Sequence, residues 1–134
     1  MAQINENSLT GYRQPQWSIP TKHYCMTLGL RDNPELIREY EEWHHPAKIW
    51  KEIPRGLREV GILDMEIYRS GNLLIMILTV PVDFDFDVEM KKLTDLPRQT
   101  EWEDMMAKYQ QAVPGTSSAE RWQRQERVFK LPGS

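Results

Sequence analysis

Histidine is the side chain best suited to moving protons near neutral pH, and this chain places two of its three histidines side by side. Ile37, Tyr40 and His44 stand at helical spacing, so they share one face of an amphipathic helix that precedes His45. Pro46 ends this helix because it disfavours a helical conformation at the residue before it. Acid–base work by His44 is one interpretation of this pattern. A structural histidine, hydrogen-bonded locally at a helix end, is the other.

The sequence gives little support to a metal site or to covalent catalysis. His44 and His45 point roughly 100° apart on a helix, and His23 is far from both along the chain. Cys25 is the only cysteine, which excludes an internal disulfide and suits a reducing compartment. The sequence contains no Gly-rich phosphate loop and no nucleophile elbow, so phosphoryl and acyl transfer have no positive evidence.

Composition is typical of one globular domain. The 134 residues are 40% hydrophobic and 28% charged, with a net charge of −3 that gives no support for a nucleic-acid partner. No apolar run approaches the roughly 20 residues needed to span a bilayer. The first residues lack the charged and apolar regions of a secretory signal. We therefore expect a cytoplasmic protein with no membrane partner.

The elements that must position His44 begin after a polar, proline-punctuated stretch. We interpret residues 1–21 as an irregular arm, and a disordered leader fits equally well. Residues 23–30 alternate between apolar and small or polar side chains, which predicts a strand with one buried face. Asn33 is the expected N-cap, and Pro34 the first residue, of a helix that runs to about His45.

The middle of the chain predicts a second helical segment and a hairpin. Residues 49–60 have helical apolar spacing, but Pro54 interrupts them, so we expect a kink or two short pieces. Two strands, 62–68 and 73–80, flank a tight turn at 70–72. The second of these strands is apolar on both faces, which is typical of a central strand.

The remaining elements complete a repeating order. A short helix is expected to end near Leu93, and a further helix to begin at Pro97. This last helix has an apolar stripe formed by Trp102, Met105, Met106, Tyr109 and Val113. A final strand over 122–131 gives the order β-α-β-β-α-β over residues 22–132, an α+β, ferredoxin-like arrangement. One sheet face would then stay open, and a homodimer would bury it.

Aromatic and acidic residues supply the remaining candidates for a site. Trp50, Tyr68 and Trp102 offer flat rings on which the apolar side of a sugar or a planar ligand could stack, although core packing explains each ring taken singly. Most carboxylates must form a solvated surface. Glu101 and Asp104, which flank Trp102, are the acidic residues expected near a pocket.

Several short motifs, taken in order, resemble the L-rhamnose mutarotase family, which includes members thought to act on L-fucose. The resemblance covers about residues 22–132. The motifs are Lys22-His-Tyr-Cys, Glu39-Tyr40-x-x-x-His44-x-Pro46, Ile49-Trp50-x-Glu52-Ile53, Gly61-Ile-x-Asp64-x-x-Ile67-Tyr68, Gly71-Asn72-x-Leu74, Glu101-Trp102 and Val128-Phe129-x-Leu131.

The resemblance implies a dimeric α/β-barrel enzyme without a cofactor that interconverts the α and β anomers of a deoxy sugar. The general acid histidine of the family falls on His44, its substrate-binding tyrosine on Tyr40, and the second tryptophan of its Trp-Trp pair on Trp102. Two positions depart from the pattern. Met65 replaces a sugar-contacting tyrosine, and Glu101 replaces the first tryptophan of the pair. These departures bear on which sugar is bound more than on the reaction.

On this hypothesis His44 donates a proton to the ring oxygen and Tyr40 positions a hydroxyl group. Trp102 and Trp50 would stack on the sugar, and Glu101 or Asp104 would hold its hydroxyls. Met65 and Tyr68 complete the expected substrate-binding set.

Two other classes of function stay open. The same fold serves cofactor-free monooxygenases and haem-degrading proteins, in which His44 would act as a base or a haem ligand. A binding module without catalysis is the third possibility, and its pocket would simply be core.

Overall fold

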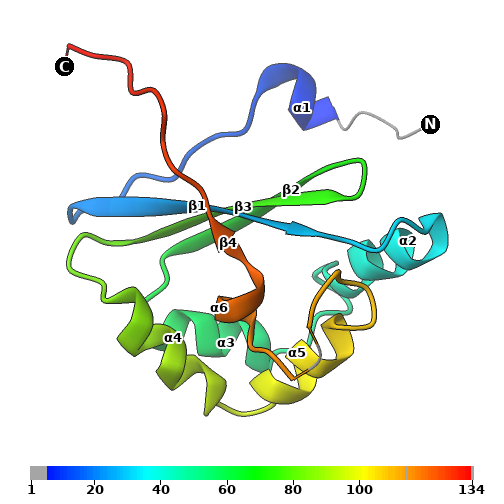
Figure 1. The fold of residues 1–134 in the computed structure, drawn as a ribbon. Helices are drawn as coiled ribbons and strands as arrows, with labels where there is room; N and C mark the ends of the chain where they lie inside the picture. The colour runs from blue at the N-terminus through cyan, green and yellow to red at the C-terminus, as the bar shows by residue number, and fades with distance from the viewer. Residues whose placement is uncertain (1–5, 114, 134) are drawn as a thin grey trace.

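The computed structural model describes residues 6–113 and 115–133. The strands form one antiparallel sheet with the order β2-β3-β1-β4, and the helices pack beside this sheet (Figure 1). The strands are β1 (Thr21–Gly29), β2 (Asp64–Ser70), β3 (Leu73–Pro81) and β4 (Gln123–Arg124). The helices are α1 (Glu6–Thr10), α2 (Pro34–Trp43), α3 (Glu52–Glu59), α4 (Phe86–Thr94), α5 (Gln99–Met106) and α6 (Ser118–Arg121). The predicted α+β class and the β-α-β-β-α-β order are confirmed.

The core lies between the sheet and a layer of helices. In Figure 1, α3, α4, α5 and α6 cover one face of the sheet, whereas the arm that carries α1 lies on the other side. Met26 of β1 is paired with Met76 of β3, which in turn is paired with Ile67 of β2, so these three side chains point to the helices together. The predicted alternation of β1 and the central position of β3 are confirmed.

Helix α2 begins as the sequence predicted. The side chain of Asn33 accepts hydrogen bonds from the backbone N–H groups of Glu35 and Leu36, at 3.0 and 3.1 Å. The helix ends at Trp43, two residues before the predicted end, and His44 is its C-cap. His44 is therefore held by the last turn of α2 and at the same time projects beyond it.

Helix α3 is one continuous helix, so the predicted kink is wrong. Pro54 is its third residue, where a backbone N–H has no partner within the helix, and the missing donor costs nothing. Gly56 is buried, and a Cβ atom there would lie 3.4 Å from a methyl carbon of Leu96. The glycine thus allows close packing and does not interrupt the helix.

The predicted final strand over 122–131 is mostly wrong. Only Gln123 and Arg124 pair with β1, and they follow α6, a short helix opened by a capping box between Ser117 and Glu120. Beyond residue 125 the described chain leaves the sheet. Its apolar side chains are then exposed: Val128 at 93%, Phe129 at 70% and Leu131 at 71%.

The stripe predicted on the helix after Pro97 extends too far. Trp102, Met106 and Tyr109 are buried, but Val113 is 69% exposed. Helix α5 ends at Met106, and the chain then turns so that Gln110 forms a bridge with Leu30 at the end of β1. The helical period therefore no longer applies at residue 113.

The N-terminal arm was expected to be irregular, but it contains α1. Its Tyr12 ring contacts Tyr68 of β2 edge-on at a centroid distance of 5.6 Å. Farther along, the carbonyl oxygen of Pro20 accepts a hydrogen bond of 3.1 Å from the N–H of Val82. The arm thus covers part of the sheet face that the helices leave open.

Candidate active site

The helix layer and the sheet enclose a cavity of about 100 Å³ that is lined mainly by apolar side chains. A wider hollow of about 390 Å³ shares His44, Met65 and Ile67 with it, and adds Arg58 and Asp64 at the edge strand β2. His44 is part of the lining of both hollows, and the wider one is bordered by residues of α3 and β2.

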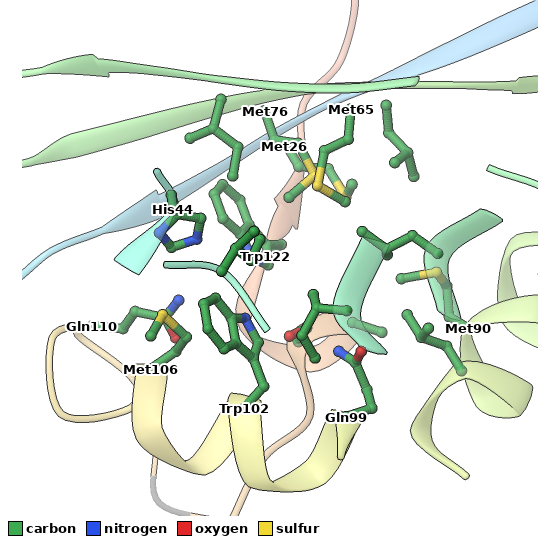
Figure 2. A pocket seen from close by; sticks show the side chains of 18 of the residues that line it. Met26, His44, Met65, Met76, Met90, Gln99, Trp102, Met106, Gln110 and Trp122 are labelled. Atoms are coloured by element: carbon green, nitrogen blue, oxygen red, sulfur yellow. The ribbon is translucent and has the colours of Figure 1, made fainter. Parts of the chain in front are cut away.

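Methionine dominates the apolar lining. Figure 2 shows Met26, Met65 and Met76 pointing down from the strands, and Met106 coming from α5 on the opposite side. Met90 of α4 lies farther along the same cavity. Thioether side chains are flexible and polarisable, so they adapt to an irregular apolar surface such as the methyl-bearing side of a small molecule.

His44 is held in one tautomer. Its Nδ1 atom lies 2.7 Å from the backbone carbonyl oxygen of Tyr40. A carbonyl oxygen only accepts, so Nδ1 carries the hydrogen and Nε2 is the nitrogen that can exchange a proton. Burial lowers the pKa of His44, and the hydrogen bond to the Tyr40 carbonyl opposes this only in part. The imidazole is therefore neutral at pH 7.

Aromatic rings fix the orientation of His44. Its ring centroid is 4.2 Å from that of Tyr40 and 5.4 Å from that of Trp102, which meets it edge-on. Trp50 also packs edge-on against Trp102, with ring centroids 5.4 Å apart, and the Arg98 guanidinium lies 3.7 Å from the centre of the Trp50 ring. Residues from α2, α5 and the segment before α3 thus form one connected stack around the imidazole.

Tyr40 is a buried hydrogen-bond donor. Its hydroxyl is hydrogen-bonded to the side chain of Gln110, whose carbonyl oxygen accepts from Nη1 of Arg121 at 3.2 Å. Gln110 therefore turns its amide nitrogen to Tyr40, so the tyrosine hydrogen is available to another acceptor. Burial raises the pKa of Tyr40 far above its usual value, so the phenol stays protonated.

Four of the residues predicted from the sequence come together at this cavity. His44, Tyr40, Trp102 and Met65 all line it. Trp50 does not line it but contacts the ring of Trp102. Its predicted role in stacking on a sugar stays a prediction.

The other candidates lie elsewhere. Glu101 is exposed and forms an ion pair of 3.7 Å with Arg98, and Asp104 is exposed on the same helix. Tyr68 pairs with Ile75, on the sheet face opposite the cavity, where it contacts Tyr12. Within one chain these three residues do not reach the cavity, so their predicted contacts with a sugar have no support from its lining.

Sequence reasoning missed several polar and aromatic residues of the cavity. Gln99 precedes Trp102 by three residues, so helical spacing places both on one face of α5, and this signal was available. Gln110 follows the end of that helix, and Trp122 was assigned to a strand. Only the tertiary fold brings these two residues to the cavity.

Residues 6–113 and 115–133 contain neither a cluster of metal-binding side chains nor a membrane-spanning helix. No group of three or more His, Cys, Asp or Glu side chains in residues 6–113 and 115–133 is arranged to hold a metal ion. None of the helices in the same ranges combines the length and the apolar character needed to cross a membrane.

Comparisons with known proteins identify the family of this chain. The family model for L-rhamnose mutarotase matches residues 23–131. An L-fucose mutarotase of Xanthomonas campestris pv. campestris is 38% identical over 107 residues, which cover 80% of this chain and 86% of the relative. A UPF0734 protein of Dictyostelium discoideum is 34% identical over 118 residues, covering 85% and 93% of the two chains.

A solved structure shows the same fold. The crystal structure of an L-rhamnose mutarotase from Formosa agariphila matches with a TM-score of 0.61 at 20% identity, covering 83% of this chain and 99% of that one. The matched segment of the family model holds every residue of the stack around His44. The chain belongs to the L-rhamnose mutarotase family.

Proposed function

We propose that this protein is an isomerase that interconverts the α and β anomers of a 6-deoxy-L-sugar. The observation that carries this proposal is the neutral His44 in the lining of both hollows, with Nδ1 fixed and Nε2 left to exchange a proton. Mutarotation needs such a group, because both the opening and the closing of the ring require proton transfers to and from sugar oxygens.

A single nitrogen can serve both proton transfers. Nε2 of His44 takes the proton of the anomeric hydroxyl, and the imidazolium gives that proton to the ring oxygen as the bond between this oxygen and C1 breaks. Both oxygens are attached to C1, so the imidazole needs to move little between them. Rotation about the C1–C2 bond then turns the other face of the aldehyde to the ring oxygen, and the same steps in reverse close the ring. Tyr40 would donate a hydrogen bond to a substrate oxygen and hold it in place.

L-fucose is the first sugar to test. The relative from Xanthomonas campestris, named for L-fucose, is 38% identical to this chain. The methionine lining suits the C6 methyl group that L-fucose and L-rhamnose share. The resemblance places a sugar-contacting tyrosine at the position of Met65, so a methionine there would remove one polar contact and change which hydroxyls are recognised.

The test is anomer exchange measured by magnetisation-transfer proton NMR. Wild-type protein is added to L-fucose, L-rhamnose, D-galactose and D-xylose, and exchange between the α and β anomeric signals is compared with that of each sugar alone. We expect added exchange for a 6-deoxy-L-sugar and much less for the two controls. If no sugar gains exchange, mutarotation is not the activity, and haem binding followed by absorbance becomes the next measurement.

The pH dependence of exchange tests which form of His44 begins the cycle. Burial lowers the pKa of His44 below its usual 6.5. Because the neutral form must accept the first proton, we expect a rate that is constant above about pH 6.5 and falls on the acid side, with its midpoint below 6.5. A rate that increases as the pH falls through this range would mean that the cation begins the reaction.

The same pKa shift affects stability, which must be controlled. The unfolded chain binds a proton at His44 more readily than the folded protein does, so stability falls as the pH drops below about 6.5. Circular dichroism at each pH separates this loss of fold from loss of the reactive form.

A homodimer is the proposed assembly, and the exposed C-terminal side chains support it. Val128, Phe129 and Leu131 are each at least 70% exposed in one chain, which is costly for large apolar side chains. We expect sedimentation at twice the chain mass, with Phe129→Glu shifting the protein toward monomer. Val113→Glu is the matched control, since Val113 is 69% exposed but lies far along the chain from this tail. A monomeric wild type would overturn the proposal.

The compartment is proposed on chemical grounds. Cys25 is a free cysteine, as suits a reducing environment such as the cytoplasm.

A further inference from the structure

We propose that the side-chain carbonyl oxygen of Gln99 accepts a hydrogen bond from a ring hydroxyl of the sugar. This hydroxyl lies on the side of the ring remote from the anomeric carbon. This inference rests on the proposed mutarotase function and names the residue that recognises the far side of the substrate. Nothing in the residues predicted from the sequence, or in the acid–base chemistry of His44, assigns a role to this glutamine.

Gln99 lines the cavity and carries a polar atom with no partner there. The residue is only 4% exposed, and its Oε1 atom is buried without a hydrogen bond among the described residues. A buried carbonyl oxygen that has lost its water and gained nothing is costly, and native proteins rarely leave one so. A donor that enters the cavity would remove this cost.

Neighbouring residues fix which end of the Gln99 amide faces the cavity. Its nitrogen donates to Oε2 of Glu103 at 2.8 Å. The other carboxylate oxygen of Glu103 accepts from the backbone N–H of Ser118 at 3.1 Å. Glu103 is thus an acceptor on both oxygens, so the amide nitrogen must face it and the amide oxygen must face away. Gln99 lines the cavity, so the polar atom that it has left for a ligand there is an acceptor, and only a donor such as a hydroxyl group satisfies it.

The arrangement of Gln99, Trp102 and His44 indicates which hydroxyl is read. Figure 2 shows Gln99 and Trp102 rising from the same side of α5, with His44 near the indole. Gln99 is one helical turn from Trp102, about 5–6 Å between Cβ atoms, and the His44 ring contacts Trp102. The two polar groups thus flank the indole. A pyranose with C1 at His44 directs C4, or the neighbouring C3, to Gln99.

A hydrogen bond from the C4 hydroxyl to Gln99 would discriminate between L-fucose and L-rhamnose. The C4 hydroxyl is axial in L-fucose and equatorial in L-rhamnose, so an acceptor fixed at one position favours one of them. Recognition by a buried acceptor is also strict, because an analogue without the hydroxyl leaves that acceptor unpaired.

The first arm of the test needs no variant. Anomer exchange by wild type is measured with the better parent sugar and with its 2-, 3- and 4-deoxy analogues, each corrected for its own uncatalysed rate. Loss of the hydroxyl that Gln99 binds should lower kcat/KM by about 10- to 100-fold, for the 4-deoxy or the 3-deoxy analogue. Equal values for the parent and both of these analogues would overturn the proposal.

The second arm assigns the effect to Gln99. Gln99→Met keeps the length of the side chain and removes the amide. Its kcat/KM for the parent sugar should be lower than that of wild type by a similar 10- to 100-fold. In this variant, kcat/KM for the same deoxy analogue should be no more than about 3-fold below that for the parent sugar, because the acceptor is already absent. Gln123→Met, at an exposed glutamine of β4, should behave as wild type. Thermal unfolding of each variant reports on the fold.

Failure of this inference and failure of the proposed function look different. If wild type catalyses exchange but Gln99→Met is equally active on the parent sugar, the carbonyl is satisfied in another way and the inference fails alone. If calorimetry shows that wild type binds L-fucose but the protein does not catalyse anomer exchange, the proposed mutarotase function is wrong. A loss of that binding with the 4-deoxy or 3-deoxy analogue and in Gln99→Met would still support the role of Gln99.

Discussion

Replacing His44 by alanine is expected to reduce protein-dependent anomer exchange by about 10²- to 10⁴-fold, which is the usual contribution of a general acid–base group. The reason lies in the geometry: Nδ1 is committed to the Tyr40 carbonyl at 2.7 Å, so Nε2 is the atom that the imidazole offers to substrate. The measurement is magnetisation-transfer NMR with L-fucose, after subtraction of the exchange that the sugar shows alone.

The neighbouring histidine supplies a matched control. His45 is exposed, and its Nδ1 accepts a hydrogen bond of 3.1 Å from the backbone N–H of Ala47, outside the cavity. His45→Ala should therefore keep nearly all of the wild-type exchange. If His44→Ala stays folded and keeps full activity, His44 is a structural residue and the assignment is wrong. Full loss in both variants would point to damage at the end of α2.

The largest effect on stability is expected at Trp102. Its side chain is only 6% exposed and contacts the rings of both His44 and Trp50. Trp102→Ala removes most of this packing and leaves a cavity, which should lower the free energy of unfolding by about 3–5 kcal/mol. Exchange should also fall, because the imidazole loses one of the two rings that hold its orientation. Urea unfolding and NMR exchange measure the two effects.

Two further variants separate packing from chemistry at this site. Trp102→Phe keeps an aromatic ring, so it should recover most of the stability. Trp17 lies in the N-terminal arm and is 38% exposed. Trp17→Ala should therefore lower the free energy of unfolding by no more than about 1 kcal/mol. An unfolding free energy for Trp102→Ala equal to that of wild type would contradict the packing described for the stack.

The contrast between Met65 and Tyr68 shows where sequence reasoning about the site stopped. The two residues are three positions apart on β2, so the alternation of a strand requires them to face opposite ways. The sequence does not say which face carries the cavity. Pairing of Ile67 with Met76, and of Met76 with Met26, settles it, and Tyr68 lies on the other side with the arm.

Glu101 and Trp50 are absent from the lining of the cavity for a related reason. Adjacency to Trp102 in the sequence suggested that Glu101 would reach a pocket, but neighbours on a helix point in different directions, and Glu101 pairs with Arg98 at the surface. Trp50 reaches the same arginine from another segment of the chain. Its contact with Trp102 follows from packing between segments, which no local pattern contains.

The sequence by itself determined the features that depend on neighbours along the chain. The buried face of β1, the cap at Asn33 and the contact between Tyr40 and His44 all follow from local spacing, because a residue one turn or two strand positions away is fixed by backbone geometry. The tertiary structure alone decided what depends on distant segments. It brought Gln110 and Trp122 to the cavity, and it released the tail beyond residue 125 from the sheet. These outcomes reflect competition between alternative packings of the whole chain, which local spacing does not encode.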